Sequence, residues 1–231
     1  MKCLILASGF GTRMYPLTIN QAKPLLPYKG KPMINHIVDK IPRDIEILVN
    51  VNKKFEADFY KWQREQKRDI VICVEDVYSD EEKLGAIGSV AHWIREKRIE
   101  QDLLLFGSDN YFEFDLSSFM AAFNGENTLL AVYDVGDPSR ATRYGVVRLE
   151  GNRVIELEEK PAHPKSSLVS TACWIIPSRV FRFITEFGLE TRQDNLGNFI
   201  TYLLEKDQVY AFPFKETWID IGNLEVYNAT K

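Results

Sequence analysis

The sequence is poor in the residues that build disulfide frameworks, metal clusters and nucleic-acid surfaces. Its 231 residues include three cysteines and three histidines, and the formal net charge is −4. Cys3, Cys73 and Cys173 are far apart, odd in number and set in apolar, strand-like segments, which predicts buried free thiols in a reducing compartment. The negative net charge argues against a general nucleic-acid surface.

Long apolar runs are also missing. No run reaches the length that spans a membrane, and Met1-Lys2 leads directly into an apolar strand rather than a signal peptide. We therefore expect a cytoplasmic protein with no membrane partner. The remaining composition, 45% hydrophobic and 27% charged, is ordinary for a globular protein, and the length fits one α/β domain over residues 1–231.

Strand patterns alternate with helix patterns along the chain. The expected strands are residues 3–7, 45–51, 70–74, 103–106, 128–133, 144–149, 154–157, 168–176 and 208–212, and the expected helices are 33–41, 55–62, 90–94, 116–123, 178–187, 195–204 and 225–231. This alternation predicts an α/β fold, a Rossmann-like mixed, mainly parallel sheet flanked by helices, with an inserted β lobe that begins at the 144–157 hairpin. Phe55, Phe59 and Trp62 form one helical face, which indicates core packing.

The loop after the first strand carries the strongest functional signal. Gly9 and Gly11 allow a tight turn and a close approach of ligand to backbone. Such a turn directs N–H groups into one concavity that suits phosphate oxygens, while Arg13 and Lys23 add cations. The stretch therefore predicts a loop that binds a polyphosphate. The simpler alternative is a strand-to-helix turn that uses glycine for its backbone freedom alone.

Two other glycine-rich loops are excluded by spacing. A dinucleotide-binding fingerprint needs a third glycine where this chain has Met14. A P-loop needs Gly-Lys-Ser/Thr at its end, and this stretch contains no such triplet.

The loop resembles the signature of the sugar-1-phosphate nucleotidyltransferases, also called nucleotide-diphosphate-sugar pyrophosphorylases. The resemblance, glucose-1-phosphate thymidylyltransferase-like in detail, covers Gly9-x-Gly11-Thr12-Arg13-x-x-Pro16-Leu17-Thr18 and Lys23-Pro24-Leu25-Leu26-Pro27. It departs at Ser8, where the family usually has Ala or Gly, and at Ala22, where Pro or Ser is common. Neither departure removes a charge or a glycine.

The resemblance implies a nucleotide site in the first half of the chain, residues 1–135. The residues that match the family's nucleotide-binding positions are Leu6, Ala7, Gly9, Gly11, Thr12, Arg13, Lys23, Gly85 and Gly88. Arg13 would hold the departing β- and γ-phosphates, and Lys23 would face the charge that develops at the α-phosphate. The segment from Gly85 to Gly88 departs from the family at Ala86, which removes a hydroxyl.

A sugar site is implied in residues 136–231, in the lobe that holds the hairpin. In the family, the second glutamate of Glu-Glu-Lys-Pro binds sugar hydroxyls and the lysine binds the sugar phosphate. In this sequence these positions are Glu159 and Lys160. The matching Tyr144-Gly145 turn would lie against the sugar, and Thr171 would line the pocket. Ala172 replaces the family's usual glycine, which leaves the identity of the sugar open.

Two aspartates match the family's metal ligands. Asp109 follows a buried strand in Gly107-Ser108-Asp109-Asn110, and Asp220 lies in Trp218-Ile219-Asp220-Ile221-Gly222. On local sequence alone, a turn is the better explanation of Asp109-Asn110, and the metal assignment depends on the match to the family's Gly-Asp-Asn motif. Carboxylates at the carboxyl end of a strand suit Mg²⁺, which takes one or two of them together with phosphate oxygens and water.

The resemblance thus implies an enzyme that uses Mg²⁺ to join a nucleoside triphosphate, dTTP or UTP, to a sugar 1-phosphate with release of pyrophosphate. Arg13, Lys23 and Asp109 would be its catalytic residues, and a homo-oligomer is compatible with the sequence. Two alternatives stay open: a cytidylyltransferase that acts on a phosphorylated alcohol such as phosphocholine, and a catalytically silent sensor of sugar nucleotides.

Overall fold

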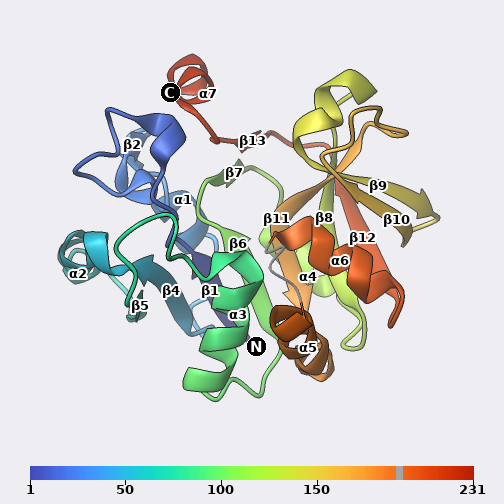
Figure 1. Ribbon diagram of the computed structural model, residues 1–231, viewed down its shortest axis with the longest axis horizontal. Helices are drawn as coiled ribbons and strands as arrows, with labels where there is room; N and C mark the ends of the chain where they lie inside the picture. The colour runs from blue at the N-terminus through green and yellow to red at the C-terminus, as the bar shows by residue number, and fades with distance from the viewer. Residues whose placement is uncertain (191–194) are drawn as a thin grey trace. The chain divides into compact units, whose positions relative to one another are not determined.

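A computed structural model of the protein describes residues 1–190 and 195–231 (Figure 1). The chain divides into two compact units. Unit 1 comprises residues 1–83, 106–113 and 217–231, and unit 2 comprises residues 84–105 and 114–216. Each unit therefore combines segments from distant parts of the sequence, and the expected assignment of nucleotide binding to 1–135 and sugar binding to 136–231 stays a prediction.

Unit 1 is built on parallel strands. β1 (Lys2–Leu6) pairs with β4 (Ile47–Asn52), which pairs in turn with β5 (Ile70–Glu75). The helix α2 (Glu56–Arg64) packs on β4 and β5 and buries Phe59 and Trp62. The expected strands and the expected aromatic core are confirmed here. Because the strands are parallel, their carboxyl ends share one edge of the sheet.

Smaller elements complete unit 1. They are the hairpin of β2 (Pro27–Tyr28) and β3 (Lys31–Pro32), the short helix α1 (Asn35–Val38), the antiparallel pair β7 (Asn110–Phe112) and β13 (Trp218–Asp220), and the C-terminal helix α7 (Leu224–Thr230).

The helix expected over 33–41 is shorter in the structure. Its ends form tighter turns, in which the N–H groups of His36 and Lys40 bond to carbonyls three residues earlier.

At the other end of the chain, the Tyr227 hydroxyl donates to the Pro27 carbonyl at 2.6 Å. This bond ties α7 to the β2–β3 hairpin.

Unit 2 pairs its strands mostly in the antiparallel sense. Their order is β11 (Leu168–Ile176), β8 (Thr128–Asp134), β12 (Val209–Phe214), β10 (Arg153–Glu159), β9 (Gly145–Glu150). β8 and β12 are parallel, whereas the β11–β8, β12–β10 and β10–β9 pairs are antiparallel. The expected hairpin is therefore confirmed as β9–β10.

Helices cover the sheet of unit 2. They are α3 (Gly85–Glu96), α4 (Leu116–Ala121), α5 (Phe181–Glu190) and α6 (Leu196–Leu204). α3 packs against α5, and α6 packs on β10. The remaining strand, β6 (Leu103–Gly107), begins in unit 2 and ends in unit 1.

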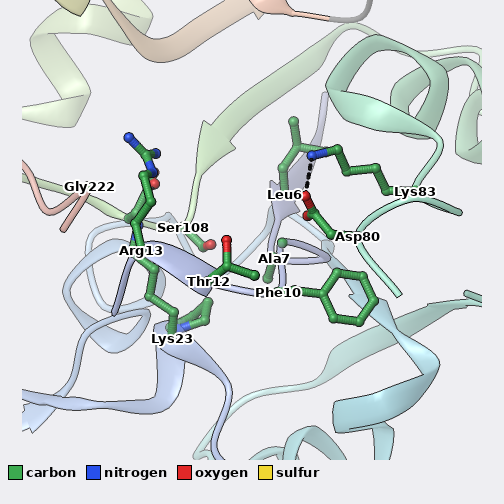
Figure 2. Close-up of a pocket in the computed structure, with 14 residues that line it drawn as sticks. Leu6, Ala7, Phe10, Thr12, Arg13, Lys23, Asp80, Lys83, Ser108 and Gly222 are labelled. Carbon is green, nitrogen blue, oxygen red and sulfur yellow. Dashed lines mark hydrogen bonds and ion pairs between the residues drawn. The ribbon is translucent and has the colours of Figure 1, made fainter. Parts of the chain in front are cut away.

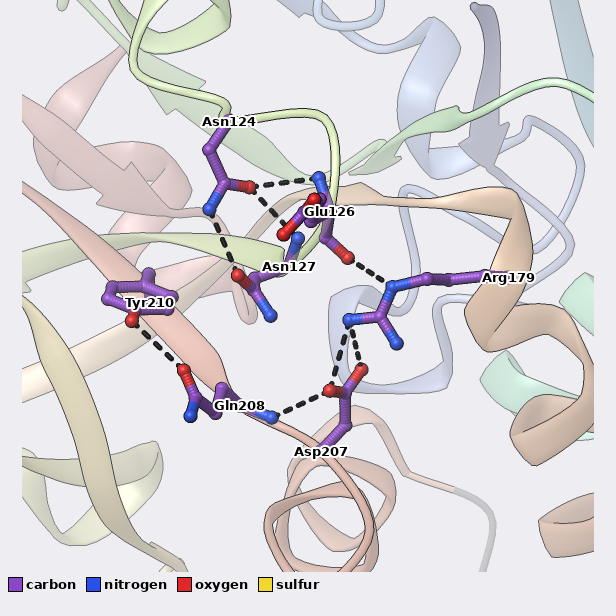
Figure 3. Close-up of polar contacts among 7 residues, drawn as sticks. All are labelled: Asn124, Glu126, Asn127, Arg179, Asp207, Gln208 and Tyr210. Carbon is purple, nitrogen blue, oxygen red and sulfur yellow. Dashed lines mark hydrogen bonds and ion pairs between the residues drawn. The ribbon is translucent and has the colours of Figure 1, made fainter.

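Polar side chains connect two turns at the edge of unit 2. The Arg179 side chain donates to the Glu126 carbonyl at 2.6 Å and pairs with the Asp207 carboxylate at 2.7 Å (Figure 3). The Asn124 amide in turn donates to Asn127 Oδ1 at 2.9 Å. These contacts join the turn that precedes β8 to the turn that precedes β12. They therefore fix the starts of these two parallel strands relative to each other.

The expected α/β class, a sheet flanked by helices, is confirmed, and the parallel pairing that the sequence predicts prevails in unit 1. The three cysteines are buried and free, as expected. Among the described residues, no helix combines the length and apolar character that crossing a bilayer requires. The cytoplasmic location stays a prediction.

Candidate active site

The loop that follows β1 is anchored at its first residue. The Asn50 amide donates to the Ser8 hydroxyl at 3.0 Å, and the Asn52 amide donates to the Ser8 carbonyl at 2.8 Å. Both asparagines are buried at the carboxyl end of β4. Ser8, the departure from the family signature, therefore makes a side-chain contact that Ala or Gly could not make.

The two glycines of the loop serve different purposes. Gly11 has φ of 65°, and a Cβ there would lie 3.1 Å from Thr18 Cγ2 and 3.2 Å from Lys23 Cβ. The Thr18 hydroxyl also donates to the Gly11 carbonyl at 2.7 Å, which closes the loop. A Cβ at Gly9, by contrast, would meet no described protein atom within 4 Å. Gly9 leaves open space on the side from which a ligand can approach the backbone.

Lys23 and Asp109 form an ion pair, although they are distant in sequence. Lys23 Nζ lies 2.8 Å from Asp109 Oδ2, and the lysine side chain is largely buried while that of Asp109 is one-third exposed. Burial disfavours the charged carboxylate, but the charge and hydrogen bond of Lys23, together with hydrogen bonds from Asn110 and the backbone, outweigh it, so the pKa of Asp109 lies below its usual value. The structure thus holds an ionised carboxylate beside the glycine loop.

A chain of hydrogen bonds joins the two aspartate motifs. Trp218 Nε1 donates to Asn110 Oδ1 at 2.8 Å, and Asn110 Nδ2 donates to Asp109 Oδ1 at 3.0 Å. The pairing of β13 with β7 sets Asp220 opposite Asn110, and the Ile221 N–H donates to the Asp109 carbonyl at 2.9 Å. Asp109 and Asp220, predicted to act together, are thus on directly paired segments.

Arg13 faces the same side of the site as Asp220. A Cβ at Gly222 would lie 3.4 Å from Asp220 Oδ2 and 3.8 Å from Arg13 Nη1. The Arg13 guanidinium and the Asp220 carboxylate therefore both border the space that a side chain at Gly222 would occupy. Arg13 lies in a 3-10 turn (Thr12–Met14) that directly follows the left-handed Gly11.

The glycine loop, Lys23, Asp109 and Gly222 line a cavity of about 330 Å³ in unit 1, whereas Asp220 is not one of its lining residues. It contains the predicted residues Leu6, Ala7, Gly9, Gly11, Thr12, Arg13, Lys23 and Asp109. In Figure 2, Arg13 lies on one side of the pocket and the Asp80–Lys83 ion pair on the other, and Thr12 lies between them. The pocket therefore has a cationic end near the aspartates and a second polar end that carries both signs of charge.

Several residues that line the cavity had no predicted role. Asp80 and Lys83 belong to a run that reads as an ordinary exposed charge cluster, and their position just before Leu84-Gly85 was the available signal. Phe10 and Ser108 also line the cavity. They lie inside the quoted motifs, so only their side-chain direction was unforeseen.

The two aspartates fit a divalent cation in one particular way. Among residues 1–190 and 195–231, no group of three or more His, Cys, Asp or Glu side chains could enclose a metal ion. Mg²⁺ rarely needs such a cage, because it binds through one or two carboxylates and completes its shell with phosphate oxygens and water. The donor set of Asp109 and Asp220 suits that ion.

The predicted sugar residues lie together in unit 2. Register in the β9–β10 hairpin sets Glu159 opposite Gly145, and the Lys160 N–H donates to the Tyr144 carbonyl at 2.9 Å. Lys160 has φ of 49°, and its Nζ lies 3.1 Å from Glu159 Oε1. Tyr144, Gly145, Glu159 and Lys160 therefore form one cluster at the open end of the hairpin.

Thr171, the fifth predicted sugar residue, is engaged in the sheet. It is buried in β11, and its hydroxyl donates to the Ala131 carbonyl of β8 at 3.0 Å. This bond gives Thr171 a structural role, and its contact with a sugar stays a prediction.

Gly85 and Gly88 lie at the start of α3. Gly85 has φ of 77° and its carbonyl accepts from the Ser89 hydroxyl at 2.6 Å. The left-handed backbone explains why glycine occupies this position. Its contact with a nucleotide stays a prediction.

Comparison with known proteins identifies relatives over almost the whole chain. A sequence model of one protein family, described as nucleotidyl transferase, matches residues 2–230. A mannose-1-phosphate guanyltransferase of Schizosaccharomyces pombe is 30% identical over 98% of this chain and 62% of its own length. The bifunctional protein GlmU of Methanocaldococcus jannaschii is 27% identical over 96% of this chain. The chain spans about half (51%) of that relative's length.

Solved structures agree with the fold. A Bacillus anthracis protein, provisionally assigned as a glucose-1-phosphate thymidylyltransferase and crystallised with sucrose, superposes with a TM-score of 0.86. It is 26% identical, and the alignment covers 100% of this chain and 93% of that one. A UDP-glucose pyrophosphorylase complexed with UDP-glucose, 17% identical with a TM-score of 0.80, shares the fold.

Proposed function

Because the chain belongs to the nucleotidyl transferase family, we propose that it transfers a nucleotidyl group from a nucleoside triphosphate to a sugar 1-phosphate. One observation carries this proposal: the glycine loop opens onto a pocket that collects Arg13, Lys23 and Asp109. Two cations and an ionised carboxylate around an open backbone turn suit a triphosphate better than a neutral ligand.

The chemistry is one displacement at phosphorus. A phosphate oxygen of the sugar 1-phosphate forms a bond to the α-phosphorus of the nucleoside triphosphate. The bond from that phosphorus to the oxygen between the α- and β-phosphates breaks, and pyrophosphate leaves with this oxygen. No general base is needed, because the sugar phosphate is already ionised at neutral pH. Catalysis then consists of positioning and of stabilising negative charge.

Each charged residue of the pocket has a role in that step. Arg13 binds the departing β- and γ-phosphates through its forked guanidinium. Lys23 neutralises the charge that develops at the α-phosphate, and it can turn to that phosphate from its present partner Asp109, 2.8 Å away. The lysine is then paired both before and after the nucleotide binds.

Asp109 and Asp220 would hold Mg²⁺. When bound, the ion supplies charge neutralisation between two anionic substrates. The hydrogen bond from Asn110 to Asp109 and the pairing of β13 with β7 support this assignment, because the first restricts the Asp109 carboxylate and the second fixes the backbone of Asp220.

For the sugar phosphate we assign Glu159 and Lys160. Glu159 accepts hydrogen bonds from sugar hydroxyls and Lys160 binds the phosphate, with Tyr144 and Gly145 against the ring. The 3.1 Å contact between Lys160 Nζ and Glu159 Oε1 supports this division of roles, since the two groups are adjacent as the ends of one small ligand would require.

For the base we assign a pyrimidine, so that the triphosphate is dTTP or UTP. The thymidylyltransferase assignment of the B. anthracis neighbour and the segment that starts at Gly85 support it. Asp80 and Lys83, at the end of the pocket away from Arg13, offer an acceptor and a donor for a base edge.

Pyrophosphate release tests the proposal directly. The protein is incubated with Mg²⁺, each of five nucleoside triphosphates and several hexose 1-phosphates, and pyrophosphate is measured. We expect release that requires both substrates and is fastest with dTTP or UTP. Faster release with GTP or ATP would overturn the base assignment, and release with phosphocholine and CTP alone would favour a cytidylyltransferase. Nucleotide-sugar binding without any release would identify a sensor.

A further inference from the structure

The carboxylate of Glu159 lies in a seat formed by two glycines. A Cβ on Gly145, its partner in the β9–β10 register, would lie 3.2 Å from Glu159 Oε2. A Cβ on Gly197, in the first turn of α6, would overlap Oε2 and lie 2.9 Å from Glu159 Cδ and 3.3 Å from its Cβ. Only glycine at position 197 leaves the carboxylate in its present place.

The first turn of α6 is fixed in position, so the seat is rigid. Asn195 caps the helix, with Oδ1 accepting from the Asn198 N–H at 2.8 Å. One turn later, the Thr201 hydroxyl donates to the Leu157 carbonyl of β10 at 2.9 Å. Leu157 precedes Glu159 by two residues in the same strand, so this bond holds α6 directly over the strand that carries the carboxylate.

The seat also orients the carboxylate. Oε2 lies against Gly145 and Gly197, while Oε1 lies 3.1 Å from Lys160 Nζ. The glutamate side chain is 17% exposed, whereas that of Lys160 is 59% exposed. Glu159 is thus held before any ligand arrives.

We infer that Gly197 is a positioning residue for the sugar site. Its missing side chain allows α6 to seat Glu159, so that the carboxylate meets the sugar hydroxyls in a preset orientation beside Lys160. The inference rests on the proposed function, because it assumes that Glu159 binds the sugar. It adds a residue that touches no substrate and lies in a helix outside the Glu-Glu-Lys-Pro segment.

The Gly197→Ala variant tests it. The new Cβ would displace the flexible end of the Glu159 side chain rather than backbone, so we expect the fold to persist while the carboxylate turns away. Loss of one charge-assisted hydrogen bond predicts a rise in the KM for the sugar 1-phosphate of about ten-fold or more. The KM for the nucleoside triphosphate should change by no more than about two-fold.

Gly188→Ala is the matched control. Gly188 lies in α5, also in unit 2, and the one described atom that a Cβ there would meet is Ala91 Cβ, at 4.0 Å. This variant should leave both KM values at the parent level. The control separates the effect of a new methyl group on a helix of unit 2 from its effect on Glu159.

A double-mutant cycle with Glu159→Ala gives the decisive readout. Once the glutamate is truncated, the overlapping Oε2 and Cδ are gone and only a Cβ contact of 3.3 Å remains. Adding Gly197→Ala to Glu159→Ala should then change neither the sugar KM nor the melting temperature. This double variant should also fold if Gly197→Ala alone does not.

The outcomes separate the inference from the function on which it rests. A parent protein without sugar-dependent pyrophosphate release overturns both. A parent that is active, with a Gly197→Ala variant whose sugar KM is unchanged, overturns the inference alone. Additive effects in the cycle also overturn it, because they would show that Gly197 acts independently of Glu159.

Discussion

The two units hold their key carboxylates in opposite ways. In unit 1, Asp109 is held by donors: Lys23 contacts one oxygen at 2.8 Å and Asn110 the other at 3.0 Å. In unit 2, the Glu159 carboxylate occupies the space left by the missing side chains of Gly145 and Gly197, and its Oε1 lies 3.1 Å from Lys160 Nζ.

This difference bears on what each carboxylate can do. A carboxylate with both oxygens bonded to donors keeps its charge and its place, as a ligand for a cation must. A carboxylate seated on glycines keeps its orientation but leaves hydrogen-bonding capacity for hydroxyl groups. The predictions below test whether the first arrangement serves catalysis and the second serves sugar binding.

The largest effect is expected from the aspartates of unit 1. Asp109→Asn or Asp220→Asn should lower kcat by about 100-fold to 1,000-fold, the loss typical for removal of one group that stabilises developing charge. The double variant should lose little more, because residues that act as one unit are not additive. The measurement is pyrophosphate release with Mg²⁺ titrated. Asp115→Asn, a helix-capping residue of unit 2, is the control and should keep its turnover.

Near-normal turnover and Mg²⁺ dependence in Asp220→Asn would contradict the two-carboxylate site. Asp109 would then have to bind the ion alone. The contrast between the units would also weaken, because the link from β13 to β7 would no longer have a catalytic purpose.

A smaller effect is expected from the cation of unit 2. Lys160→Ala should raise the KM for the sugar 1-phosphate by roughly 10-fold to 100-fold, since a charged hydrogen bond to phosphate is lost. Lys165→Ala is a close control, because Lys165 is equally exposed and also pairs with a glutamate, Glu156, at 2.8 Å. A rise in the nucleotide KM alone would show that the hairpin does not bind the sugar.

The motifs of the loop were predictable because their chemistry is local. The glycines at 9 and 11 and the cations at 13 and 23 predict a phosphate site without reference to the rest of the fold. All four residues line the cavity of unit 1. The strands and the aromatic core of α2 were equally clear, since each depends on a short periodic pattern.

The contacts that hold the site could not be read from the sequence. The bond from Trp218 to Asn110 and the seat that Gly197 offers to Glu159 join residues far apart in the chain. No local pattern distinguishes Gly197 from any other glycine in a helix. In unit 2 the sequence predicted the antiparallel β9–β10 hairpin but not the antiparallel β11–β8 and β12–β10 pairs, because pairing between distant strands depends on tertiary contacts.

The next effect, below that of Lys160→Ala, is expected from the hydrogen bond that links the two aspartate motifs. Trp218→Phe removes the donor to buried Asn110 Oδ1, which should lower the free energy of unfolding by about 1–3 kcal/mol. It should also lower kcat by about 10-fold, the smaller end of the loss that follows when a group supporting a metal ligand is removed, since Asn110 positions Asp109. Chemical denaturation and pyrophosphate release measure the two effects.

Trp62→Phe is its matched control. Trp62 is a buried tryptophan of unit 1 whose Nε1 donates to Asn35 Oδ1 at 2.7 Å. Both variants should lose similar stability, but only Trp218→Phe should lose turnover. Equal turnover in the two variants would show that the Trp218–Asn110 bond is purely structural.

The smallest effect concerns acid stability and follows from the lowered pKa of Asp109. Its pKa in the folded protein lies below the value of about 3.9 that an unfolded chain would show. The folded state therefore binds fewer protons, so the Lys23–Asp109 pair stabilises the protein above this value and loses its effect as the pH falls through the folded pKa. Asp109→Asn lacks that contribution at every pH. Thermal melting should accordingly show a difference between parent and Asp109→Asn that is largest near neutral pH and shrinks below about pH 4. A difference that stays constant down to pH 2 would mean that the Lys23–Asp109 pair adds no charge-dependent stability, and that donors do not hold the carboxylate of unit 1 in the way proposed.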